Sequence, residues 1–121
     1  LPEDWFRKIA AVLPDKPFAV AETGFLAGDY RHLRHLVWIR AKPSDQATYV
    51  ERLLTEAHRL NAEFVIWYVP VDYDRLWEKM SAQGMDAWFA QWMRSGLWDA
   101  ALQERPALAV WKSWLALPYR P

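Results

Sequence analysis

The chain has 121 residues, enough for one domain, and 53% of them are apolar, so a hydrophobic core can form. Lysine and arginine together number 15, as do aspartate and glutamate, and the resulting zero net charge argues against a nucleic-acid partner. With no cysteine, disulfides and thiolate metal sites are excluded, and no apolar run has the length of a membrane-spanning helix. We therefore treat residues 1–121 as a single segment with neither nucleic acid nor membrane as a partner.

The first predicted elements are a helix and a buried strand. Leu1–Leu13 has an amphipathic pattern, with Pro2 in the first turn and Pro14 directly after the end. The apolar run Phe18–Glu22 follows, and such a run is typical of a strand buried on both faces of a parallel sheet. Chemistry in these sheets lies just past the carboxyl ends of the strands, so Glu22 is the first candidate functional residue.

A long connection, Phe25–Lys42, separates this strand from the next helix. It has no clear periodicity, although Leu36–Ile39 could be extended, and its length favours a functional loop over a simple link. Within it, His32 and His35 have a spacing that would hold a metal on a helix. Because no third ligand has an obvious position, we interpret the pair as part of a polar loop and expect no metal.

A second helix and a second strand come next. The helix is predicted over Ser44–Leu60, with Ser44 as its N-cap and Asn61 as its C-terminal stop. The apolar run Glu63–Val69 is the second buried strand, and Pro70 ends it.

Shorter helical patterns complete the chain. They cover Tyr73–Met80, Asp86–Arg94 and a last helix that Pro106 opens. In the last helix we expect these residues to face inward: Leu108, Trp111, Leu115 and either Val110 or Trp114. The order helix, strand, helix, strand, helix predicts an α/β fold with parallel strands. Two strands alone cannot bury both faces or satisfy their edges, so the pattern indicates part of a larger sheet.

Three stretches of this sequence resemble a known group of enzymes. KPFAVAETGF, PSDQATYVERLLTEAHRLNAEFVIWYVPVDYD and RPALAVWKSWL look like the closing part of a (β/α)8-barrel glycoside hydrolase, from the large retaining superfamily often called clan A. The resemblance covers nearly the whole chain and implies a partial TIM barrel. Phe18–Glu22 would be strand 7 and Glu63–Val69 strand 8, with the three main helices as helices 6, 7 and 8. It also implies a carbohydrate substrate and no cofactor.

The resemblance assigns roles to three residues at the strand ends. Glu22 falls on the nucleophile of those enzymes, although by itself it could be a solvated strand-end carboxylate. Trp67 falls on the aromatic floor of the sugar site, with Tyr68 as a weaker candidate, although Trp67 could equally be core. Arg31, His32 or Tyr30 on the long loop could keep a nucleophilic carboxylate ionised, and Tyr30 is also a candidate for substrate contact.

Two further residues are candidates for carbohydrate contact. Trp38 lies on the long connection and could line a cleft. Asp72, with Asp74, could bind sugar hydroxyls or a cation, or could form a turn followed by a helix cap.

One catalytic group of the family has no counterpart in this chain. The family's acid/base glutamate usually follows an asparagine at the end of strand 4, whereas the only asparagine here, Asn61, is not followed by glutamate. A retaining mechanism needs two carboxyl groups roughly 5–5.5 Å apart. We therefore expect the isolated chain to be inactive unless a partner chain or a parent protein supplies the remaining strands.

The sequence thus leaves two functions open. The first is part of a retaining glycoside hydrolase that carries the strand 7 nucleophile. The second is a non-catalytic carbohydrate-binding or assembly module derived from a barrel. The amino end lacks the basic and apolar regions of a signal peptide, and the glycan, its linkage and the compartment stay open.

Overall fold

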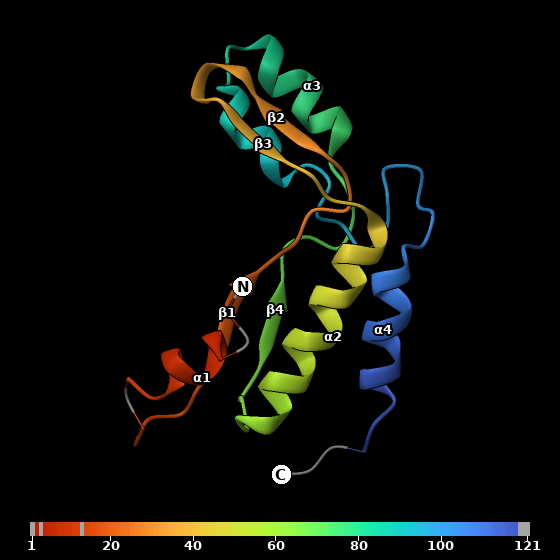
Figure 1. Cartoon of the computed structure of the whole chain (residues 1–121). Helices are drawn as coiled ribbons and strands as arrows, with labels where there is room; N and C mark the ends of the chain where they lie inside the picture. Colours follow the sequence, from red (N-terminus) through yellow and green to blue (C-terminus); the bar gives the residue numbers. More distant parts are fainter. Residues whose placement is uncertain (1, 3, 13, 119–121) are drawn as a thin grey trace.

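The computed structural model describes residue 2 and residues 4–12 and 14–118. Its helices and strands are, in chain order, α1 (Trp5–Ala10), β1 (Val20–Thr23), β2 (Tyr30–His32), the 3-10 helix η1 (Leu33–His35), β3 (Val37–Ile39), α2 (Pro43–Arg59), β4 (Val65–Trp67), α3 (Asp74–Ala82), the 3-10 helix η2 (Ala87–Trp92) and α4 (Pro106–Leu115). Figure 1 shows a lower body built from α1, β1, β4, α2 and α4, and above it a lobe built from β2, β3, α3 and η2.

Strands β1 and β4 form a parallel pair, as the alternation of strands and helices predicts. Backbone hydrogen bonds extend beyond the two short strands, from Glu63 N–H to the Phe18 carbonyl at 2.8 Å and from Tyr68 N–H to the Thr23 carbonyl at 2.7 Å. The fold is therefore mixed α/β, with two parallel strands in the part of the chain that the structure describes.

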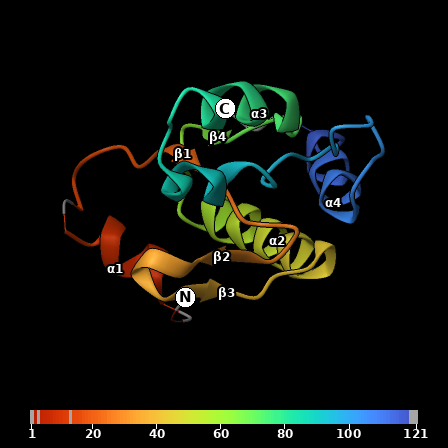
Figure 2. The ribbon, with the colours of Figure 1, turned by 90° about the horizontal axis from the view of Figure 1, so that it is seen from above.

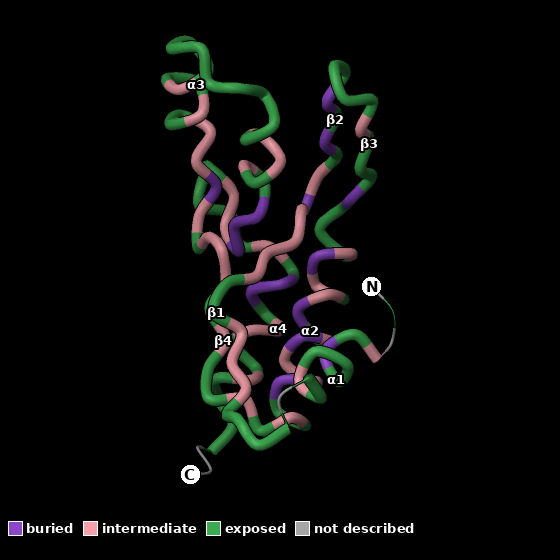
Figure 3. The backbone as a smooth tube through the Cα atoms, turned by 90° about the vertical axis from the view of Figure 1, so that its left-hand side faces the viewer, coloured by how far each residue is buried: buried purple, intermediate pink, exposed green. Residues whose placement is uncertain are grey.

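The core lies between the helices, at one end of the strand pair. Val50 of α2 and Leu108 of α4 are buried together with Leu97 and Ala107. In Figure 3 buried residues gather on α2, whereas β1 and β4 are intermediate or exposed along their length. The prediction that Leu115 faces inward is wrong, since it is 73% exposed. The buried residues of α4 lie in its first turn, and Val110 rather than Trp114 packs against the core.

The ends of α2 follow from local chemistry. Pro43 takes the first helical position, where its missing N–H costs nothing, so the cap moves to Lys42 and the prediction of Ser44 as N-cap is wrong. The Lys42 N–H donates to the Asp45 carboxylate at 3.0 Å. At the other end Asn61 has a φ of 53°, the left-handed conformation that terminates helices, as predicted.

The long connection after β1 folds into an antiparallel hairpin, β2–β3, joined by η1. Tyr30 and His32 are buried while Arg31 between them is exposed, which is the alternation of a strand with one covered face. The extended stretch expected near Leu36–Ile39 is β3. Seen from above in Figure 2, η2 lies between this hairpin and α3.

Two other segments are shorter or tighter than predicted. The first helix spans only Trp5–Ala10, and the predicted ends Leu1 and Leu13 lie outside the described residues. The pattern over Asp86–Arg94 forms a 3-10 helix.

Among the described residues, no helix combines the length and apolar character that a bilayer span requires.

Both connections that build the upper lobe leave the carboxyl ends of the parallel strands. The hairpin follows β1, and α3 with η2 follows β4. The lobe therefore lies above the carboxyl ends of the strands, where parallel α/β folds have their functional sites.

Candidate functional site at the carboxyl ends of the parallel strands

A bulge in β1 determines where Glu22 lies. Val20 pairs with Val65 and Thr23 pairs with Trp67, so two residues of β1, Ala21 and Glu22, stand opposite the single residue between the partners in β4. Such an extra residue disrupts the ladder and redirects side chains. Ala21 and Glu22 are both exposed, whereas the flanking Val20 and Thr23 are half-buried.

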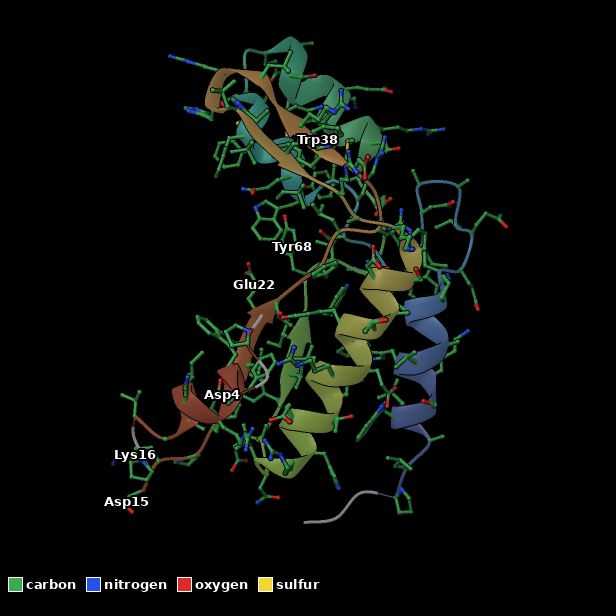
Figure 4. The ribbon with its side chains drawn as sticks, viewed as in Figure 1. Asp4, Asp15, Lys16, Glu22, Trp38 and Tyr68 are labelled. Carbon is green, nitrogen blue, oxygen red and sulfur yellow. The ribbon has the colours of Figure 1, made fainter. Side chains whose placement is uncertain are left out.

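The two faces of the strand pair differ in what covers them. On one face, the Thr23 hydroxyl is hydrogen-bonded to the Tyr49 hydroxyl of α2 at 2.6 Å, and Trp67 packs against Trp111 of α4. The other face carries Ile66, which is 52% exposed. Glu22 is exposed and lies on the side of the strand pair away from α2 and α4 (Figure 4).

Glu22 and Tyr68 stand at the same end of the strand pair. Figure 4 shows both at the carboxyl ends of β1 and β4, below the lobe that contains Trp38, with Asp4 and Asp15 toward the opposite end. Within the described part of the chain, the Glu22 carboxylate makes no ion pair or hydrogen bond. It is an accessible, unpaired carboxylate at a strand end.

The residues expected to keep Glu22 ionised are engaged within the upper lobe. The buried Tyr30 hydroxyl donates to the Ala87 carbonyl at 3.1 Å, which fastens the hairpin to η2. Burial, and secondarily the charge of Asp86, raises the pKa of Tyr30. The Arg31 guanidinium lies 4.0 Å from the centre of the Trp38 ring.

Trp38 is exposed but its ring is occupied. Besides Arg31, the Arg40 guanidinium lies over the ring, 4.5 Å from its centre. These cation–π contacts support the hairpin surface. Where an arginine lies over the ring, a sugar would have to displace it in order to stack on that face of Trp38.

Trp67 contributes to the core side of the sheet. Its indole N–H donates to the Ser95 carbonyl at 2.9 Å, and its ring contacts Tyr49 of α2 and Trp111 of α4 at centroid distances of 6.2 and 6.1 Å. Of the two interpretations of Trp67, these contacts favour core packing over a sugar platform. Tyr68, one residue later, is the aromatic residue that lies at the carboxyl end of β4.

Asp72 is an internal ion-pair partner. Both of its carboxylate oxygens bind the Arg105 guanidinium, and Oδ1 also accepts the Gly96 N–H at 2.8 Å. Its side chain is only 3% exposed. These contacts favour the turn-forming role over contact with sugar hydroxyls, while Asp74 lies in the first turn of α3.

His32 and His35 take part in hydrogen bonds within the upper lobe. The His35 N–H donates to Nδ1 of the buried His32 at 3.3 Å, which leaves Nε2 to carry the proton toward Asp86, also 3.3 Å away. No cluster of three or more histidine, aspartate or glutamate residues suited to a metal occurs among the described residues.

A pocket of about 380 Å³ opens beside Tyr68, between the end of β4, α3 and η2. Its aromatic walls include Trp77, Phe89 and Trp92, and Tyr68 meets Trp92 edge-on at a centroid distance of 6.0 Å. Neither Trp77 nor Trp92 is among the candidate site residues that the sequence indicated. The only available signal was the density of aromatic residues after the second strand.

Comparison of the chain with models of protein families, with curated proteins and with solved structures gave no match.

Proposed function

We propose that this chain is the closing part of a retaining glycoside hydrolase barrel, with Glu22 as the nucleophile at the end of strand 7. The observation that carries the proposal is the bulge, which holds an exposed carboxylate at the carboxyl end of a parallel strand, on the face away from the helices. In a (β/α)8 barrel, helices cover the outer face, and active-site residues lie at the carboxyl ends of the strands.

The incompleteness of the sheet supports the barrel part of the proposal. Within the described residues β1 and β4 pair only with each other, so their outer edges lack partners. The helix-free face exposes half of Phe64 and half of Ile66. Further parallel strands on both edges would satisfy the backbone groups and enclose these side chains.

In the completed barrel, the Glu22 carboxylate would attack the anomeric carbon and displace the leaving group, forming a glycosyl-enzyme ester. A second carboxyl group, roughly 5–5.5 Å away, would protonate the departing oxygen and then activate the water that releases the sugar. The completing strands must contribute that group. Tyr68, at the neighbouring strand end (Figure 4), would contact the sugar or the group attached to it.

The test begins with the native mass of the purified protein and the identity of every polypeptide in it. A complex that contains further strands is assayed on a panel of aryl glycosides. We expect Glu22→Gln to lower kcat by on the order of 10⁴-fold or more, and Glu63→Gln, an exposed glutamate before the opposite end of β4, to leave it unchanged. Azide should rescue Glu22→Ala and give a glycosyl azide of inverted configuration, because azide replaces the missing nucleophile.

A different outcome would favour the second candidate function, a non-catalytic binding or assembly module. This module is supported by the unpaired outer edges of β1 and β4, and by the lack of a partner for Glu22 among the described residues. A stably folded monomer of about 14 kDa would favour this module, and a complex that contains the further strands but hydrolyses no glycoside would reject the catalytic proposal. Activity that survives Glu22→Gln would do the same.

A further inference from the structure

The pocket beside Tyr68 differs chemically from a sugar-binding site. Trp77 and Met80 of α3 form one side, and Phe89 and Trp92 of η2 form another. None of the described residues that line the pocket has a charged side chain. A sugar ring carries several hydroxyls that each need a hydrogen-bond partner, and a pocket with so few polar groups would leave most of them unsatisfied.

The polar side-chain groups of the pocket are neutral, and two of them lie together. Burial raises the pKa of Tyr73, and the adjacent Tyr68 hydroxyl raises it further. Tyr73 therefore stays a neutral phenol across the physiological range. A ligand that places a hydroxyl or an ether oxygen against this tyrosine pair and its ring against the aromatic walls would satisfy both parts of the pocket.

Volume and position restrict the ligand further. About 380 Å³ lies at the lower end of the range for small-molecule sites and suits one or two fused rings. Tyr68 lines the pocket and also stands at the strand end next to that of Glu22 (Figure 4). A group bound in the pocket would therefore be adjacent to a sugar held at Glu22.

We propose that this pocket binds a neutral, planar aromatic group, the aglycone of a phenolic glycoside. The aglycone assignment rests on the proposed function, whereas the binding of an aromatic group does not depend on it. The ring lies among Trp77, Phe89 and Trp92, and its oxygen points to Tyr68 and Tyr73. The substrate class is then aryl glycosides rather than unbranched oligosaccharides.

The first test is calorimetric titration of the full chain with 2-naphthol, with methyl glucoside as the comparison ligand. We expect saturable binding of one naphthol and no detectable binding of the methyl glucoside. Leu76→Trp should weaken naphthol binding at least ~10-fold, because Leu76 lines the pocket, is 53% exposed and can be enlarged into it without disturbing the core. Leu115→Trp is the matched control on the exposed end of α4 and should leave the affinity unchanged.

The two proposals fail separately. If Glu22→Gln binds naphthol normally while the complete protein hydrolyses no glycoside, the pocket stands and the hydrolase proposal falls. If hydrolysis depends on Glu22 but naphthol does not bind, or binds equally to Leu76→Trp, the pocket proposal falls. Tighter binding of methyl glucoside than of naphthol would also overturn it.

Discussion

Asp72 and Arg105 form a bidentate ion pair that connects the exit of β4 to the start of α4. Arg105 Nη1 lies 2.9 Å from Oδ1 of Asp72, and Nη2 lies 2.5 Å from Oδ2. The two side chains are 3% and 13% exposed, and Arg105 Nη1 also donates to the Gly96 carbonyl at 2.8 Å. Two parallel charge-assisted hydrogen bonds fix both the distance and the orientation of the elements that they join.

Removing one partner of this pair should be costly. We expect Asp72→Ala to lower the free energy of unfolding by about 3–5 kcal/mol, because it leaves the Arg105 charge buried and unpaired. Urea unfolding followed by tryptophan fluorescence measures the change. The exposed pair between Lys112 and Glu104 provides the control, and Glu104→Ala should cost only about 0–1 kcal/mol. Similar costs for the two variants would contradict a structural role for Asp72.

Gly24 brings the ends of β1 and β4 together. A Cβ at this position would lie 2.7 Å from the Tyr68 carbonyl oxygen, a backbone atom that cannot turn away. Gly24→Ala should therefore lower the free energy of unfolding by about 1–3 kcal/mol, as overpacked sites do.

Gly28→Ala is the comparison variant for Gly24→Ala. Its Cβ would meet the flexible side chain of Arg94, which can move aside, so its cost should be clearly smaller. Equal urea unfolding midpoints for Gly24→Ala and Gly28→Ala would contradict this prediction. They would show that β1 and β4 can move apart at their carboxyl ends at little cost.

Acid should loosen the upper lobe through Asp86. The Trp88 N–H, and next the His32 side chain, hold the pKa of Asp86 below its usual value. A lowered pKa in the folded state means that the group stabilises the fold above the ordinary aspartate pKa of about 3.9 and that this stabilisation is lost as the pH falls below it. Asp86→Asn should flatten the fall of Tm with pH in that acidic range.

The control for the pH experiment is Asp15→Asn, because Asp15 is exposed and has no partner among the described residues. It should keep the acid dependence of the unchanged protein. If Asp86→Asn keeps it as well, the contacts of Asp86 do not contribute to stability.

Periodicity was enough to predict the elements of the lower body. Pro43 and Asn61 bound a helix whose apolar residues recur on one side, and the two apolar runs form the parallel pair. These features depend on residues close in sequence, or on a pattern that a sheet imposes along each strand. The upper lobe depends instead on distant contacts, such as the hydrogen bond from Tyr30 to Ala87, 57 residues later.

The candidate site was only partly predictable for a related reason. Glu22 could be chosen because a carboxylate at the end of an apolar run is recognised without knowledge of the partner strand. Which face it occupies depends on the bulge, and a bulge is a property of the register between two strands. The choice between Trp67 and Tyr68 likewise depends on which face the helices cover.

Substitution of Trp67 should mainly affect stability, whereas substitution of Tyr68 should mainly affect ligand binding. Trp67→Ala should lower the free energy of unfolding by about 3–5 kcal/mol, since its ring packs between two helices and its N–H donates to the Ser95 carbonyl. Trp67→Phe keeps most of the ring, stays folded, and should bind 2-naphthol with unchanged affinity. Tyr68→Ala should instead weaken naphthol binding while costing less stability than Trp67→Ala, because Tyr68 lines the pocket at the strand end. Calorimetry and urea unfolding on the same samples measure both quantities. Loss of binding in Trp67→Phe, with normal binding in Tyr68→Ala, would return the ligand-contacting role to Trp67.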